Sequence, residues 1–141
     1  MPPFTRLALL MLVGIAMLSA CAGRAGDAGT DVRITLTDFG VQSSLVEFQA
    51  GTPYTFTITN EGLVPHEFMF IPPVAASTHD MHGEAVHATA LIQVEESELP
   101  PGAVYTLLYT FPQSIAGTDL EIACHTPGHY EAGMRLPITV H

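Results

Sequence analysis

The sequence of 141 residues contains no lysine and no tryptophan, and its four positively charged residues are all arginines. Fourteen aspartates and glutamates bring the formal net charge to −10. A nucleic-acid partner requires clustered Lys and Arg that neutralise phosphates, and the sequence offers no such cluster. The same shortage argues against charge-driven binding to an anionic lipid surface. We therefore expect neither kind of electrostatic partner.

Cysteine is also scarce. The chain has only Cys21 and Cys124, too few for a small fold that is framed by disulfides. Charged residues make up 13% of the chain and hydrophobic residues 48%, which excludes the composition typical of disorder. The length is that of one ordinary domain. Seven histidines and six methionines in so short a chain leave metal binding open.

One long apolar run is present, from Leu7 to Ala20, and it is shorter than the roughly 20 residues that a membrane span needs. With Arg6 before it and small residues at its end, the run predicts a secretory signal peptide over residues 1–20. The segment Leu18 to Cys21 resembles the lipobox of bacterial lipoproteins. That resemblance implies an exported protein anchored in the cell envelope through lipid on Cys21. The alternative is an ordinary cleavable signal, with Cys21 free or in a disulfide.

Residues 21–30 are small and glycine-rich, and they predict a flexible tether before a domain over residues 31–141. Thr52 to Asn60 alternates strictly between apolar and threonine side chains, which predicts a half-buried strand. Turn residues recur at the spacing of an all-β sandwich. Further strands are expected at Val32–Thr37, Leu45–Phe48, His66–Ile71, Ala103–Phe111, Leu120–Cys124 and Arg135–Val140.

The segment Pro72 to Thr89 has no strand pattern, and we expect a long excursion with a short helix near Gly83 to Ala90. It contains four donors of the kind that suits copper, imidazoles and a thioether. These are His79, Met81, His82 and His87. A weak second copper site is one hypothesis for them. The alternative is a solvated loop that happens to be rich in histidine.

The most informative residues are Cys124, His129 and Met134, which follow one another at intervals of five. A thiolate, an imidazole and a thioether are soft ligands suited to copper, whereas calcium and magnesium prefer oxygen. A blue-copper site needs a second imidazole, and His66 is the best candidate because it follows a turn-rich segment at the start of an expected strand. The alternatives are a buried structural thiol at Cys124, a capping or surface histidine at His66, and core packing for Met134.

Two segments, Asn60 to Phe68 and Cys124 to Met134, resemble the ligand segments of cupredoxins, the small blue-copper proteins. The resemblance implies an all-β, Greek-key β-sandwich with one type 1 copper. In it His66, Cys124 and His129 would be equatorial ligands, and Met134 the weak axial ligand.

Two residues depart from the family pattern: Glu67 follows the first histidine, where many cupredoxins have a small polar residue, and His125 follows the cysteine, where Thr or Ser is frequent. Both positions lie where side chains tune the redox potential. For His125 we consider a surface residue, a hydrogen-bond donor behind the ligands, or an alternative ligand.

Four protein ligands leave no coordination position for a substrate, so we predict a monomeric carrier of single electrons and not an enzyme. Its partners would be other redox proteins. The alternative is copper homeostasis outside the cytoplasm, with copper-handling proteins as partners. An oxidase would need a second copper site between domains, and a zinc site would not use a methionine ligand. Three acidic residues are expected to form a solvated turn, with a partner-docking patch as the alternative: Glu95, Glu96 and Glu98.

Overall fold

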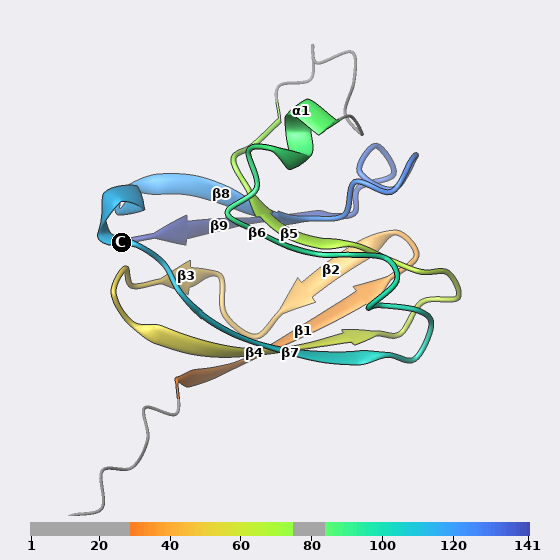
Figure 1. The fold of residues 1–141 in the computed structure, drawn as a ribbon, viewed down its shortest axis with the longest axis horizontal. Helices are drawn as coiled ribbons and strands as arrows, with labels where there is room; N and C mark the ends of the chain where they lie inside the picture. Colours follow the sequence, from red (N-terminus) through yellow and green to blue (C-terminus); the bar gives the residue numbers. More distant parts are fainter. Residues whose placement is uncertain (1–28, 75–83) are drawn as a thin grey trace, which may run out of the picture.

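The structure is a computed structural model that describes residues 29–74 and 84–141. Its two β-sheets face one another (Figure 1). The first sheet has the strand order β2-β1-β4-β7 and consists of β1 (Thr30–Thr37), β2 (Gly40–Ser43), β4 (Pro53–Asn60) and β7 (Val104–Thr110). The second has the order β3-β9-β8-β5-β6 and consists of β3 (Glu47–Phe48), β5 (Phe68–Ile71), β6 (Ile92–Val94), β8 (Thr118–Ala123) and β9 (Arg135–Val140).

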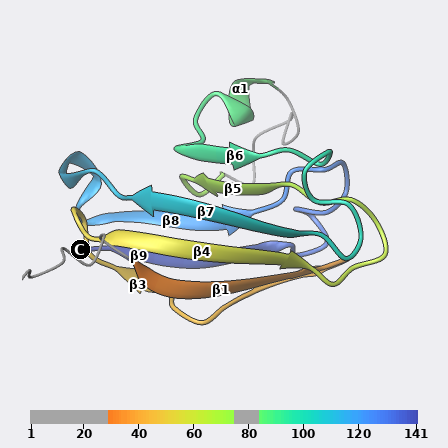
Figure 2. The same ribbon diagram turned by 60° about the horizontal axis from the view of Figure 1, so that its bottom comes forward.

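The chain crosses repeatedly from one sheet to the other, as Figure 2 shows from a second side. Two strand pairs are parallel, β1 with β4 and β3 with β9, and the other pairs are antiparallel. This arrangement confirms the predicted all-β sandwich.

Strand β4 shows the predicted alternation: Tyr54, Phe56 and Ile58 are buried and the threonines between them are half-buried. Its buried face forms the centre of an aromatic cluster that joins the two sheets. The Phe56 ring lies 5.1 Å from that of Phe70 and 5.7 Å from that of Phe48, both on the opposite sheet. Aromatic pairs at such distances stabilise a core beyond the area they bury.

The structure differs from the sequence predictions mainly at sheet edges. Strands β2 and β6, at the outer edges, are not among the predicted strands, because runs of four and three residues are too short to show a clear alternating pattern. Within the expected Leu45–Phe48 strand only two residues pair, and they do so with the end of β9. Strand β5 begins at Phe68, so His66 and Glu67 lie in the connection before it. Cys124 lies one residue beyond the end of β8.

A short helix, α1 (Glu84–His87), falls inside the predicted range Gly83 to Ala90, and one 3-10 turn, η1 (Gln113–Ile115), follows β7. The last residue of α1, His87, is one of the four donors of the hypothetical second copper site. The other three lie outside the described residues: His79, Met81 and His82. The predicted signal peptide and Cys21 also lie outside them. Among the helices of the described ranges, none has the length and hydrophobicity to cross a membrane.

Candidate metal centre

The loop between β8 and β9 is closed by hydrogen bonds among its own residues. The Cys124 amide donates to the Met134 carbonyl at 3.1 Å, which brings the two ends of the loop together. Between them, the Met134 amide donates to the His129 carbonyl at 3.0 Å. Gly128 and Gly133 have φ of +86° and +104°, a backbone region that glycine adopts without steric cost. The turn residues in the sequence thus fix where the three predicted donors of this loop lie.

His66 is placed by the connection between β4 and β5. Asn60, fully buried at the end of β4, accepts a hydrogen bond from the Gly62 amide at 2.8 Å. Its side-chain amide donates to the carbonyls of Val64 at 2.9 Å and Leu99 at 2.8 Å. One buried side chain therefore holds the loop that leads to His66. The sequence identified Asn60 only as a turn residue, because its long-range partner cannot be read from local pattern.

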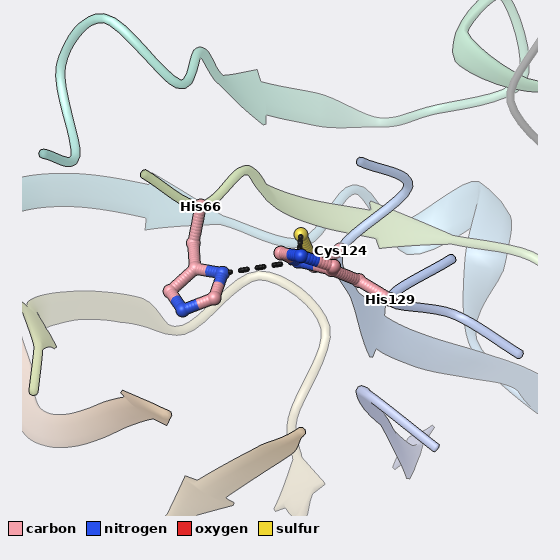
Figure 3. Close-up of side chains that lie close together, drawn as sticks. All are labelled: His66, Cys124 and His129. Carbon is pink, nitrogen blue, oxygen red and sulfur yellow. Dashed lines mark hydrogen bonds between the residues drawn. The ribbon is translucent and has the colours of Figure 1, made fainter. Parts of the chain in front are cut away.

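The ligand atoms of His66, Cys124 and His129 all lie within 4.8 Å of one another. The two Nδ1 atoms are 3.2 Å apart, and Sγ of Cys124 is 3.5 Å from Nδ1 of His129 (Figure 3). His66 and Cys124 are fully buried, and His129 is half-buried. The structure thus brings together three of the four predicted ligands in an arrangement that one ion could bridge.

Met134 is also fully buried, and it packs in the same apolar cluster as Cys124. A thioether in such surroundings serves equally well as core packing and as a weak ligand. Its role as the axial ligand therefore stays a prediction.

The second ring nitrogen of His66 faces a carboxylate that the sequence analysis did not single out. Nε2 lies 3.5 Å from Oδ1 of Asp38, which also accepts the Leu63 amide at 2.7 Å. Burial, and next the nearby His129, lower the pKa of His66, while Asp38 opposes this shift. The neutral imidazole that a metal requires is therefore the favoured form. A carboxylate behind a histidine is a common way to orient a metal-binding ring.

Burial raises the pKa of the Cys124 thiol, so the metal-free thiol keeps its proton at neutral pH. Sγ accepts the Glu67 amide at 3.4 Å and donates, as a thiol, to the Thr126 hydroxyl at 3.3 Å. That hydroxyl donates in turn to Oε1 of Glu96 at 2.7 Å. Glu96 therefore differs from the solvated acidic residue that was expected, because the fold brings its loop against the Cys124 loop.

The two residues that depart from the family pattern are both buried, with exposed fractions of 6% for Glu67 and 1% for His125. The His125 ring stacks on that of Tyr130 with centroids 4.4 Å apart, so a surface position for His125 is wrong. Glu67 Oε2 lies 3.8 Å from Nε2 of His87. His87, the donor of the hypothetical second copper site that falls within the described residues, thus lies beside Glu67.

Comparison with known proteins supports the same reading of the fold. No family model matches the chain. Two relatives are named copper-resistant cuproprotein CopI. The one from Pseudomonas aeruginosa is 27% identical over 146 residues, covering 83% of this chain and 79% of the relative. The one from Rubrivivax gelatinosus is 29% identical over 123 residues, covering 79% and 68%.

Among solved structures, reduced auracyanin from Roseiflexus castenholzii has a TM-score of 0.59 at 21% identity, covering 81% of this chain and 98% of that one. Rusticyanin from Thiobacillus ferrooxidans also has a TM-score of 0.59, at 14% identity, covering 83% and 84%. Both are cupredoxins. The chain therefore has the cupredoxin fold, which its two ligand segments had implied.

Gly62 offers a test of how His66 is held. A Cβ at this position would lie 2.4 Å from Oδ1 of Asp38 and 2.6 Å from Nε2 of His66. We expect Gly62→Ala to displace the imidazole and to lower copper affinity by about 10- to 100-fold, the usual cost of disturbing a group behind a ligand. Competition titration with a copper chelator measures the loss. Gly40→Ala is the control, because its added Cβ would meet only a threonine hydroxyl at 3.1 Å. Equal affinities in the two variants would contradict the prediction.

Proposed function

We propose that the chain binds one type 1 copper and carries single electrons outside the cytoplasm. The observation that supports this most is the convergence of His66, Cys124 and His129, whose ligand atoms lie within 4.8 Å. Two imidazoles and a thiolate are the equatorial donors of a blue-copper centre. They come from two segments far apart in the sequence, joined at one end of a cupredoxin fold.

His66 fits copper in protonation as well as in position. Both Nδ1 atoms point to the space that they share with Sγ, and burial favours the neutral form of His66. Met134, buried in the same cluster, would complete the set as a long axial ligand. Bound copper would supply a one-electron couple. The hydrogen-bonded loop would hold the donors in place through both oxidation states, which favours electron transfer over catalysis.

The surroundings also suit contact with a protein partner. Three apolar side chains near the centre are exposed: Phe39 at 69%, Leu63 at 84% and Val64 at 40%. They lie on two loops, which the hydrogen bond from the Leu63 amide to Asp38 ties together. Exposed apolar patches commonly mark interaction sites. We propose that redox protein partners dock here and exchange electrons through the half-buried His129.

Copper homeostasis is the second candidate, and the names of the two CopI relatives favour it. Two further donors lie close to the centre: the buried Glu67, adjacent in sequence to the proposed ligand His66, and the half-buried His87 beside it. Three more donors, His79, Met81 and His82, are known from sequence alone. In this alternative the chain would sequester or deliver copper.

For localisation we propose an exported monomer that is held in the cell envelope by lipid on Cys21. Support comes from the apolar run, the lipobox-like end of residues 1–20 and the glycine-rich tether that follows. No cluster of positive charge suggests a further contact with the lipid surface.

Copper binding predicts an intense visible band in the oxidised protein, from charge transfer between the Cys124 sulfur and the metal. Cys124→Ser should abolish this band, since a hydroxyl cannot form the soft, covalent bond to copper. Absorption spectra with elemental analysis of bound copper test it. Cys21→Ser is the matched control and should keep the band. An unchanged band in Cys124→Ser would refute the assignment.

Met134 should tune the potential more than it holds the ion. We expect Met134→Leu to raise the reduction potential and Met134→Gln to lower it, because a stronger axial donor stabilises Cu(II). Copper content should stay near one equivalent in both variants. Redox titration monitored at the visible band gives the potentials. Complete loss of copper from Met134→Leu would mean that Met134 is a principal ligand and that the centre is not type 1.

The number of copper ions bound tests the second site, whose presence would favour copper homeostasis over electron transfer. If the His-rich segment binds copper, titration at neutral pH should give two equivalents in the natural chain. A triple variant, His79→Ala, Met81→Ala and His82→Ala, should then bind one equivalent with an unchanged visible band. One equivalent in both proteins would end the second-site hypothesis and remove that support for copper homeostasis.

Cys21→Ala tests the lipid anchor. We expect the variant to remain unprocessed or to be released from membranes, because no thiol remains for lipid attachment. Fractionation of cells that express each form, followed by mass analysis of the mature N-terminus, shows the result. Maturation and membrane association identical to those of the natural chain would rule out the anchor.

A further inference from the structure

The Thr126 hydroxyl lies between the sulfur of Cys124 and the carboxylate of Glu96. It is 3.3 Å from Sγ of Cys124 and 2.7 Å from Oε1 of Glu96. Thr126 belongs to the loop that carries the proposed ligands, and Glu96 to the connection between β6 and β7. Both side chains are half-buried. A half-buried carboxylate is thus linked to the proposed metal-binding sulfur through one hydroxyl.

A threonine hydroxyl has a single hydrogen and two lone pairs, so it can donate to only one of its two neighbours. A carboxylate is a charged acceptor, and the 2.7 Å separation is typical of a charge-assisted O–H···O⁻ bond. The hydrogen therefore points to Glu96, and a lone pair faces the sulfur. This suits the metal-free thiol, which donates its own hydrogen to Thr126.

When Cys124 gives up its proton to bind copper, the same arrangement leaves the thiolate without a hydrogen bond from this hydroxyl. The hydrogen of Thr126 remains with Glu96. The donors to Sγ are then backbone amides, that of Glu67 at 3.4 Å and that of Thr126. Hydrogen bonds to the sulfur are one of the factors that set the potential of a blue-copper centre. Each stabilises negative charge on sulfur, which weakens its donation to Cu(II) and favours the reduced state.

We propose that Glu96 is a positioning residue that, by holding the Thr126 hydrogen, withholds a hydrogen bond from the Cys124 thiolate and keeps the copper potential low. This inference rests on the proposed copper site. Glu96 touches neither the metal-binding atoms nor a substrate. It acts by setting which way one hydroxyl points.

The test is a double-mutant cycle on the full, copper-loaded chain with the reduction potential as its readout: Glu96→Ala, Thr126→Val and the two combined. Glu96→Ala should free the hydroxyl to donate to sulfur. The reduced-to-oxidised ratio at a fixed potential should then rise by about three- to tenfold, the net strength of one hydrogen bond. Removing a negative charge alone also favours reduction. When residue 126 is valine, Glu96→Ala should raise the potential only through the lost charge. That rise should be similar to the one caused by Glu95→Ala, which removes the neighbouring exposed acid.

Two spectroscopic results follow from the same orientation. Glu96→Ala should move the sulfur-to-copper band to higher energy, because a hydrogen bond lowers the energy of the sulfur electrons. Thr126→Val alone should leave the band and the Cu–S stretching frequency close to those of the natural chain, since no hydrogen bond to sulfur is lost. Thr126→Ser in the Glu96→Ala background should restore the higher-energy band that Thr126→Val removes.

Two outcomes would overturn the inference. One is an equal shift of potential by Glu96→Ala with and without the hydroxyl at residue 126, which would mean that Glu96 acts through its charge alone. The other is a fall in potential and in band energy in Thr126→Val, which would mean that Thr126 already donates to sulfur. The second result needs no variant of Glu96, so it holds even if Glu96→Ala does not fold. A natural chain without the visible band would instead refute the copper site itself.

Discussion

The hydrogen-bonded pairing of β5 with β8 is the interaction on which the metal centre depends. The register places Met69 opposite Ala123, and since His66 precedes β5 and Cys124 follows β8, the two donors lie at the same end of this strand pair. The Glu67 amide, which donates to Sγ of Cys124 at 3.4 Å, continues the contact beyond the strands. The rings of Phe56 and Phe70, 5.1 Å apart, pack the opposite sheet against this pair. Close-packed interiors resist small displacements, and the donors inherit this rigidity.

Much of the fold and of the centre could be predicted from sequence, because their signals are local. The alternation in β4 shows which face is buried, and the even spacing of Cys124, His129 and Met134 marks one loop. Asp38 and Glu96 could not be found this way. Each contacts the centre through loop packing between segments distant in the chain, and neither carries a local pattern that distinguishes it from a solvated acid.

The centre also shows how a buried polar site remains compatible with an apolar core. With burial raising the pKa of Cys124 and lowering that of His66, both groups are neutral in the metal-free protein. Neutral groups avoid most of the cost of placing charge in a low-dielectric interior. The carboxylates of Asp38 and Glu96, which reach the donors directly or through Thr126, are only partly buried. Glu67 is buried, and its burial raises the pKa of its carboxyl group, which likewise favours a neutral form.

The closure of the β8–β9 loop has a consequence for how such a protein can diversify. The hydrogen bond from the Cys124 amide to the Met134 carbonyl, 3.1 Å long, closes the loop where the β8–β9 pairing ends. All residues of the loop lie between these two ends. An insertion or deletion within the loop would reshape the coordination sphere while leaving the register of β8 and β9 intact. The sandwich and the loop that carries three of the proposed ligands can therefore evolve independently. The sandwich keeps its architecture, while changes in the loop alter the reduction potential.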